Sequence, residues 1–94
     1  DLVLDPGTFQ VTCGQRSARL SRKEYDLLEM LMRNGGQILS KEQLLLKAWG
    51  YESNAEDNNV EVYISFLRRK LELVRSNMRI RTVRLVGYCL EEKE

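Results

Sequence analysis

The sequence contains no histidine and only two cysteines, Cys13 and Cys89, among its 94 residues. Histidine and cysteine are the usual protein ligands of zinc, and histidine is the usual general base beside a catalytic nucleophile. The two cysteines have no metal-ligand spacing and provide no disulfide framework. The sequence therefore predicts no metal site, and it predicts that both cysteines are small buried apolar residues.

Other catalytic motifs are missing as well. The chain has no glycine-rich phosphate loop, and no pair of carboxylates falls inside an expected pocket. We therefore expect no catalytic residue, no cofactor and no enzymatic activity.

Long apolar runs are also absent. No stretch reaches the roughly 18 residues that a membrane-spanning helix needs, and no basic and then apolar leader is visible. The chain has one proline, no low-complexity run and 43% apolar residues, which is typical of a folded globular domain. We expect a single cytoplasmic domain over residues 1–94 that does not contact a membrane.

The formal net charge is only +1, but the positive charge is unevenly distributed. From Ile64 to Arg84, seven lysine or arginine residues accompany one acid, Glu72. Most of the other acids lie near the N-terminus, in "YESNAED" and in the "EEKE" tail. A clustered basic face is typical of a phosphate-binding surface. On charge alone, a solvated helix face with scattered arginines remains the alternative.

The apolar pattern changes from strand-like to helix-like near residue 21. The short segments "LVLD", "TFQVTC" and "SARL" are separated by turn residues, which predicts an antiparallel sheet over residues 1–20. The segments "SRKE" and "SKEQ" are capping boxes. They predict one helix from Ser21 to Asn34 and a second from Ser40 to about Trp49, whose indole we expect between the second and third helices.

A third helix is predicted after the segment "YESNAEDNN", with Asn58 as its N-cap. On a helical wheel, one apolar stripe faces the core and the opposite face is mixed. The stripe comprises Val60, Tyr63, Ile64, Leu67, Leu71 and Val74, and the mixed face comprises Asn58, Val62, Ser65, Phe66 and Arg69, with Arg68 and Glu72 on its flanks.

The segments "IRTV" and "YCL" predict a two-stranded hairpin that turns through residues 84–87. The predicted order is therefore an N-terminal sheet over residues 1–20, three helices over residues 21–76 and a hairpin over residues 78–90. This order is that of an α+β winged helix-turn-helix fold.

In this order, the residues resemble the effector domain of OmpR/PhoB-type response regulators over essentially the whole chain. "LSRKEYDLLEMLMRNGGQILSKEQLLLKAWG" is similar to the first two helices of that family, "NVEVYISFLRRKLE" to its recognition helix and "IRTVRLVGY" to its wing. The resemblance implies sequence-specific binding of double-stranded DNA in bacterial transcription regulation. The third helix would enter the major groove and the wing would lie at the minor groove.

The resemblance also implies partners outside this segment. The family carries a phosphorylated receiver domain, which we expect to precede residue 1 in a longer protein of a two-component phosphorelay. Phosphorylation then brings two effector domains onto tandem half-sites, whereas the isolated domain is expected to be a monomer or a weak dimer.

The expected DNA contacts lie on the third helix and the wing. The resemblance assigns Arg84, at the hairpin turn, to the minor groove or its phosphates, and Arg68, Arg69 and Arg81 are expected mainly to neutralise phosphates. The complete predicted set is Asn58, Asn59, Val62, Tyr63, Ser65, Phe66, Arg68, Arg69, Arg81 and Arg84.

Four positions depart from the family pattern. Phe66 stands where many members carry arginine, Tyr63 where histidine is common, Leu85 where the wing turn usually has its first glycine, and Cys89 where a basic residue often follows the wing tyrosine. We interpret Val62 and Phe66 as an apolar pair that contacts thymine methyl groups. The alternative is a winged-helix module whose Val62/Phe66 face binds a protein in place of DNA.

The segment between the second and third helices has two interpretations. In the family this connector can contact RNA polymerase, and the acidic segment here could do the same. The alternative is a solvated turn whose acids keep that edge away from DNA. The candidate polymerase contacts are Tyr51, Glu52, Asn54 and Glu56.

Overall fold

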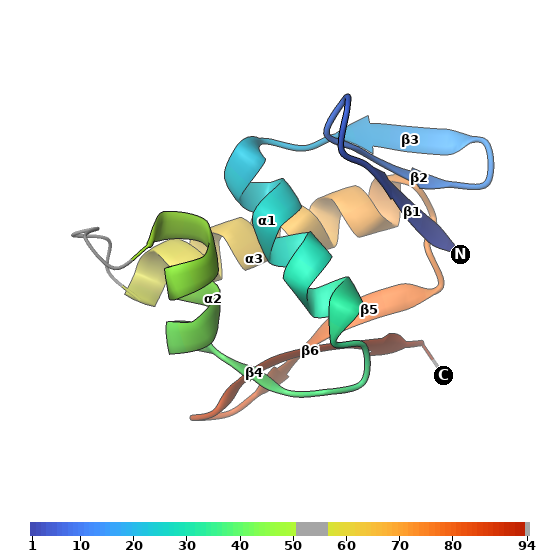
Figure 1. Ribbon diagram of the computed structural model, residues 1–94. Helices are drawn as coiled ribbons and strands as arrows, with labels where there is room; N and C mark the ends of the chain where they lie inside the picture. Colours follow the sequence, from blue (N-terminus) through green and yellow to red (C-terminus); the bar gives the residue numbers. More distant parts are fainter. Residues whose placement is uncertain (51–56, 94) are drawn as a thin grey trace.

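A computed structural model describes residues 1–50 and 57–93 of the chain, except the side chains of residues 57 and 58. It shows an N-terminal sheet, three helices and a C-terminal sheet, in the predicted order (Figure 1). None of the helices in this part of the chain is long and apolar enough to cross a bilayer.

The N-terminal sheet is the antiparallel meander that the sequence predicted. Its strands β1 (Leu2–Asp5), β2 (Gln10–Cys13) and β3 (Arg16–Arg19) pair in the order β1-β2-β3. On β2, Val11 is fully buried against the helices. The sheet thereby covers one side of the helical core.

Capping boxes start the first two helices, as predicted. Helix α1 (Arg22–Arg33) begins after Ser21, whose backbone N–H donates to Glu24 Oε1 at 2.6 Å while Ser21 Oγ accepts from the Glu24 N–H at 3.2 Å. Helix α2 (Lys41–Trp49) repeats the arrangement with Ser40 and Gln43, at 2.8 and 3.0 Å. Each box satisfies backbone N–H groups that a helix end would leave unpaired.

Helix α3 (Asp57–Leu73) begins two residues earlier than predicted, because an N-cap at Asn58 would make Asn59 the first helical residue. Asn58 therefore lies in its first turn and is not the N-cap. Aspartate is favourable in the first turn of a helix as well as at the N-cap, so the polar residues of "EDNN" do not by themselves mark where the helix begins. The helix ends in a Schellman arrangement: Ser76 N–H donates to Leu71 O and Arg75 N–H to Glu72 O, with Arg75 at φ 54°.

The C-terminal sheet has one strand more than predicted. Strands β5 (Met78–Val83) and β6 (Gly87–Glu92) form the hairpin. The two-residue strand β4 (Leu39–Ser40) pairs with the other edge of β6, which gives the order β4-β6-β5. A Cβ atom on Gly87 would lie 1.9 Å from Leu39 O, so glycine is required where β6 meets β4. This pairing fixes the end of β6 beside the hairpin turn to the start of α2.

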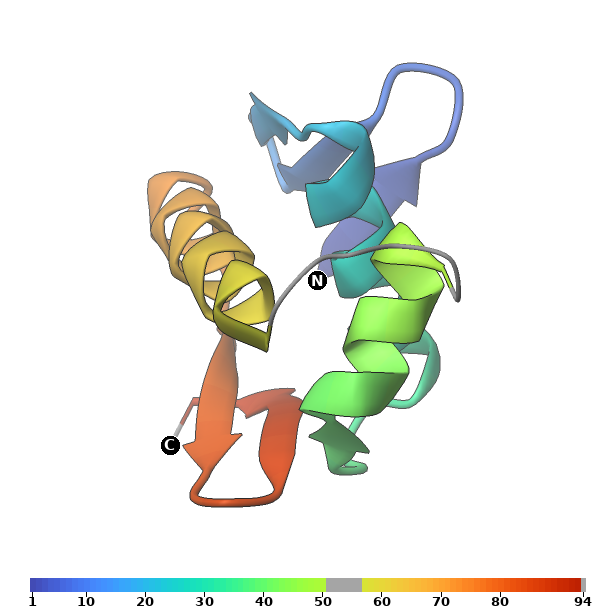
Figure 2. The same cartoon turned by 90° about the vertical axis from the view of Figure 1, so that its left-hand side faces the viewer.

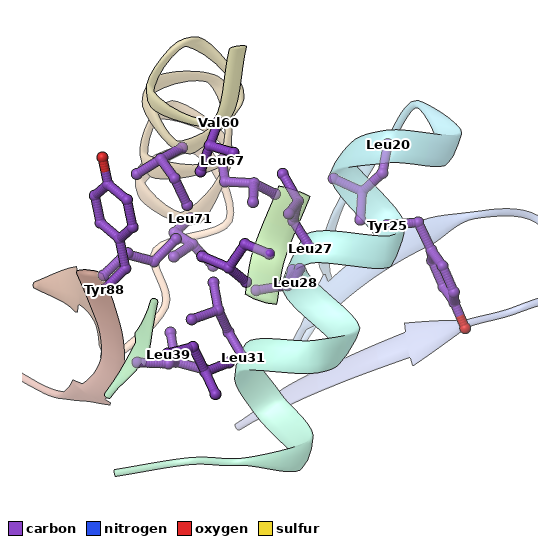
Figure 3. Close-up of a cluster of buried hydrophobic side chains, with 14 of the residues drawn as sticks. Leu20, Tyr25, Leu27, Leu28, Leu31, Leu39, Val60, Leu67, Leu71 and Tyr88 are labelled. Atoms are coloured by element: carbon purple, nitrogen blue, oxygen red, sulfur yellow. The ribbon is translucent and has the colours of Figure 1, made fainter. Parts of the chain in front are cut away.

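The core lies between the three helices and both sheets (Figures 1 and 3). The predicted stripe of α3 faces it, except that Tyr63 is only half-buried. Cys89 is buried as predicted. The same prediction is wrong for Cys13, which ends β2 beyond the core and lines an open pocket beside Arg16 and Arg75. The buried residues of the stripe are Val60, Ile64, Leu67 and Leu71 on α3 and Val74 directly after the helix.

Candidate nucleic-acid interface

The outer face of α3 combines apolar and basic side chains. Val62 is 46% exposed, Phe66 39% and Leu73 69%, and Arg69 is exposed between the last two. These positions follow one another at intervals of four, three and four residues, so they form one stripe along the helix. Ser65 is exposed beside them. Leu73 was not among the predicted contacts, which on this helix ended at Arg69.

An aromatic series supports this stripe from below. The ring centroids of Phe66 and Tyr63 are 5.5 Å apart with an interplanar angle of 78°, and those of Tyr63 and Trp49 are 5.4 Å apart with an angle of 74°. Both are edge-to-face contacts of the favourable kind. Trp49 therefore bridges α2 and α3 as predicted, although its side chain is only half-buried. The exposed ring of Phe66 is therefore held in place by Tyr63, which in turn packs against Trp49.

Arg68 ties α3 to the wing. Its Nε and Nη2 donate to Ile80 O at 3.0 and 2.8 Å, Nη2 also donates to Thr82 Oγ1 at 2.7 Å, and its guanidinium lies 5.9 Å from the ring centroid of Tyr88. These contacts hold the helix and the hairpin in a fixed relation. This structural role is additional to the predicted phosphate contact and was not visible in the sequence.

Much of the basic cluster is paired within the domain. Glu91 on β6 accepts from Arg79 at 2.6 Å and from Arg81 Nε at 2.8 Å. The hydrogen bonds from Arg81 and then from Arg79 lower the pKa of the Glu91 carboxyl. Lys70 forms a 2.7 Å ion pair with Glu24. The excess of positive charge that the sequence shows between residues 64 and 84 is therefore reduced by acids that fold in from outside that segment.

Three arginines of the cluster, Arg69, Arg75 and Arg84, have no ion-pair or hydrogen-bond partner for their guanidinium groups within the described ranges 1–50 and 57–93. Arg69 lies on the stripe of α3, and Arg84 lies at the tip of the wing. Arg75 lies beyond the C-terminal end of α3, near Cys13. Cations without internal partners can approach phosphates without first breaking a bond.

The turn of the wing has an unusual residue at its most demanding position. Val86 N–H donates to Val83 O at 3.0 Å, and Leu85 has φ 66°. A positive φ at the third residue is characteristic of a type II turn, where glycine or asparagine is usual. The left-handed conformation costs another residue about 1 to 2 kcal/mol. Leu85 adopts it while remaining 99% exposed.

The wing tip and the N-terminal end of α3 lie on the same side of the molecule. In Figure 2, which turns the left side of Figure 1 toward the viewer, the yellow end of α3 and the red hairpin turn both face forward. The N-terminal part of α3 and the wing turn, which carry most of the predicted contacts, therefore share one side of the domain.

Several predicted residues lie in the first turn of α3 or outside the described part of the chain. Asn59 is half-buried in the first turn of α3. The side chain of Asn58 lies outside the described part of the chain, as do the four candidate polymerase contacts, Tyr51, Glu52, Asn54 and Glu56. In the described residues, no three histidine, cysteine or acidic side chains gather in a metal-binding arrangement.

Comparison with known proteins identifies the family. The family model described as "Transcriptional regulatory protein, C terminal" matches residues 14–90. The chain is 46% identical over 92 residues to the response regulator MprA of Mycobacterium avium (strain 104), covering 98% of this chain and 40% of that protein. It is 42% identical over 93 residues to the transcriptional regulatory protein DltR of Streptococcus agalactiae serotype III (strain NEM316), covering 99% and 42%.

Solved structures agree with this result. The DNA-binding domain of Klebsiella pneumoniae RstA, solved in complex with the RstA box, matches with a TM-score of 0.78 and 36% identity over 96% of this chain and 90% of that one. The chain spans about two-fifths of the length of the curated relatives that it matches. It belongs to the family of C-terminal domains of transcriptional regulatory proteins, with the winged-helix fold of the OmpR/PhoB-type response regulators.

Proposed function

We propose that this domain binds double-stranded DNA and regulates transcription as the output domain of a two-component response regulator. The observation that carries the proposal is the side shared by the N-terminal end of α3 and the wing tip, together with Arg69 on α3 and Arg84 on the wing, which have no internal partners within the described residues. A relative at 36% identity, the RstA domain, has been solved with its DNA box, which supports the same role here. The family also favours a role that is not enzymatic.

The two elements would divide the work. A helix fits the major groove, about 12 Å wide, where base pairs differ in their donors, acceptors and methyl groups. The exposed face of α3 would enter that groove with Val62, Ser65 and Phe66 toward the bases. Arg69 would neutralise phosphate, and Arg84 on the wing would reach the minor groove or its backbone. Arg68 would act mainly by fixing the wing relative to α3.

The remaining predicted contacts have weaker support. Tyr63 would act chiefly as the support of Phe66. Arg81 is paired with Glu91, so its charge would be divided between that carboxylate and a phosphate. Asn58 and Asn59 belong to the first turn of α3, whose N-terminal backbone amides favour an anion such as phosphate.

The decisive experiment is selection from a random duplex library at low salt, followed by titration of the recovered duplex at several salt concentrations. Binding through phosphates requires a log–log slope of about −0.9 per neutralised phosphate. A flat salt dependence, or failure to enrich any sequence, would refute the proposal.

The whole protein would carry more than this domain, since its curated relatives are longer. We propose a receiver domain before residue 1, with phosphorylation that brings two copies onto tandem half-sites. The isolated domain would then be a monomer or a weak dimer. The acidic segment with Tyr51, Glu52, Asn54 and Glu56 would contact RNA polymerase, and the protein would be cytoplasmic.

A second candidate function rests on the apolar part of the stripe. Val62, Phe66 and Leu73 are exposed together on one helix face, and contiguous exposed apolar patches often mark protein interfaces. In this alternative the domain binds a protein through α3. The salt titration separates the two functions, because apolar burial does not weaken steeply with salt whereas phosphate contacts do.

A further inference from the structure

The tip of the wing is apolar as well as basic. Leu85 is almost completely exposed and its neighbour Val86 is 53% exposed, directly after Arg84. A single exposed leucine on a protein surface is ordinary. Two adjacent apolar side chains at the end of a projecting hairpin, next to a cation without an internal partner in the described chain, are a more specific arrangement.

Leu85 does nothing for the stability of the free domain. It contacts no core, and it holds a left-handed backbone conformation that a glycine would adopt without strain. The nearest glycine, Gly87, is the first residue of β6 and is needed there because β4 leaves no room for a side chain. Strained residues of this kind concentrate at functional sites, where a contact with a partner compensates for the strain.

The surroundings of Leu85 indicate which partner it meets. It is continuous with the proposed DNA interface, because the wing tip and the N-terminal end of α3 share one side of the molecule (Figure 2). Arg84 supplies a positive charge that favours a polyanion and disfavours a purely apolar surface. The minor groove is narrow, about 6 Å, and proteins that bind it insert leucine and similar side chains between base steps, partially unstacking them.

We propose that Leu85 is an apolar wedge that enters the minor groove beside Arg84 and partially unstacks one base step of the DNA. The inference rests on the proposed function, that the domain binds duplex DNA. Pyrimidine–purine steps such as TA and CA unstack at the lowest cost. Leu85 therefore makes the domain prefer such a step under the wing without any hydrogen bond to a base.

The test compares the parent domain with Leu85→Gly, Leu85→Asn and Leu85→Met. Glycine removes the side chain, whereas asparagine introduces a polar side chain that tolerates the left-handed backbone. Methionine keeps an apolar side chain of similar size and is the matched control. The probe is the duplex that the parent selects from a random library, with 2-aminopurine replacing one adenine at a time in the segment under the wing.

The parent and Leu85→Met should raise the 2-aminopurine fluorescence at one step, because unstacking relieves quenching. Leu85→Gly and Leu85→Asn should abolish this rise and weaken binding about ten-fold or more, the scale expected from the buried area of a leucine side chain. Their salt slope should match that of the parent, since neither substitution changes a charge. Strain relief in Leu85→Gly affects the free and bound states alike, so it does not by itself restore affinity.

Different failures have different meanings. If the parent binds no duplex, the proposed function fails, and the wedge fails with it. If the parent binds with a normal salt slope but no step brightens, or if Leu85→Gly binds as tightly as the parent, the wedge alone is overturned. If the parent self-associates in sedimentation experiments without DNA and Leu85→Gly does not, the wing tip contacts a second copy and the wedge is likewise overturned.

Discussion

Glu24 on α1 and Lys70 on α3, which are 46 residues apart in the sequence, are joined by a 2.7 Å ion pair. Glu24 Oε1 also accepts the backbone N–H of Ser21, and Lys70 Nζ also donates to Arg19 O at 2.6 Å. A single carboxylate thereby completes the start of α1 and anchors the C-terminal half of the helix proposed to read DNA. Glu24 is only 4% exposed, so this anchor is shielded from solvent.

Glu24→Gln tests the anchor. The amide can still cap α1, as Gln43 does for α2, but it removes the negative charge beside Lys70. We expect a loss of about 1.5 to 3 kcal/mol in the free energy of unfolding, the range for a hydrogen bond to a charged group. Urea denaturation measures it. Glu29→Gln on the same helix, which affects a more exposed carboxylate, is the control. Equal stability of Glu24→Gln and the parent would show that the ion pair adds nothing to the free energy of unfolding.

Glu91 provides a pH-dependent contribution to stability. Hydrogen bonds from Arg81 and Arg79 lower the pKa of its carboxyl in the folded state. The contribution is therefore present above the pKa of the unfolded chain and is lost as the pH falls through the folded pKa. We expect Glu91→Gln to flatten the acid side of the stability profile, measured by thermal unfolding between about pH 2 and 6.

The same variant tests Arg81 as a phosphate contact. Without the carboxylate, Arg79 and Arg81 are released from Glu91. If Arg81 faces the DNA backbone, Glu91→Gln should bind DNA more tightly and with a steeper salt slope. An unchanged slope would place both arginines away from the DNA.

Arg84→Ala tests the wing. Because the side chain is exposed and has no internal partner in the described residues, its removal should leave the unfolding midpoint unchanged. Binding to the selected duplex should weaken by about 1 to 3 kcal/mol, and the salt slope should fall by about 1 if the residue contacts phosphate. Arg33→Ala, at the C-terminal end of α1, is a control that removes an exposed arginine away from the wing. Equal affinities for Arg84→Ala and the parent would remove the wing from the mechanism.

Local signals in the sequence were sufficient for most of the fold. The two capping boxes and the period of the apolar residues located α1 and α2, and the apolar stripe identified the buried side of α3. Strand β4 was missed because two residues carry no period, and it exists only through its pairing with β6. The exact start of α3 was missed because an aspartate such as Asp57 is favourable both at the N-cap and in the first turn of a helix.

The site was less predictable because charges find their partners through the fold. Arg68, Lys70 and Arg81 look alike in the sequence, but they contact a backbone carbonyl, a buried carboxylate and a half-buried carboxylate. Those partners come from three different elements, and no spacing in the sequence indicates them. Exposed apolar residues were easier to interpret: Val62 and Phe66 were expected on the outer face, where the structure has them.

Phe66 is the residue at which base reading by this domain can be tested most directly. Its ring rests on Tyr63 and leaves 39% of the residue exposed, next to Val62 one helical turn away. A phenyl ring can cover a thymine methyl group or a sugar, but it has no hydrogen-bond donor for the acceptors of guanine. We therefore expect a preference for thymine at the base pair that faces Phe66.

Selections with the parent, Phe66→Ala and Phe66→Arg at one salt concentration measure this preference. The alanine variant should lose the thymine preference, and the arginine variant should shift it toward guanine, since arginine donates to both acceptors on the major-groove edge of that base. Each good contact should be worth about 1 to 3 kcal/mol. Leu73→Ala, at the far end of the same stripe, should leave the selected sequence unchanged and controls for a general loss of apolar surface. If all three proteins select one sequence with one affinity, Phe66 reads no base, and the exposed stripe of α3 is better explained as a surface that binds another protein.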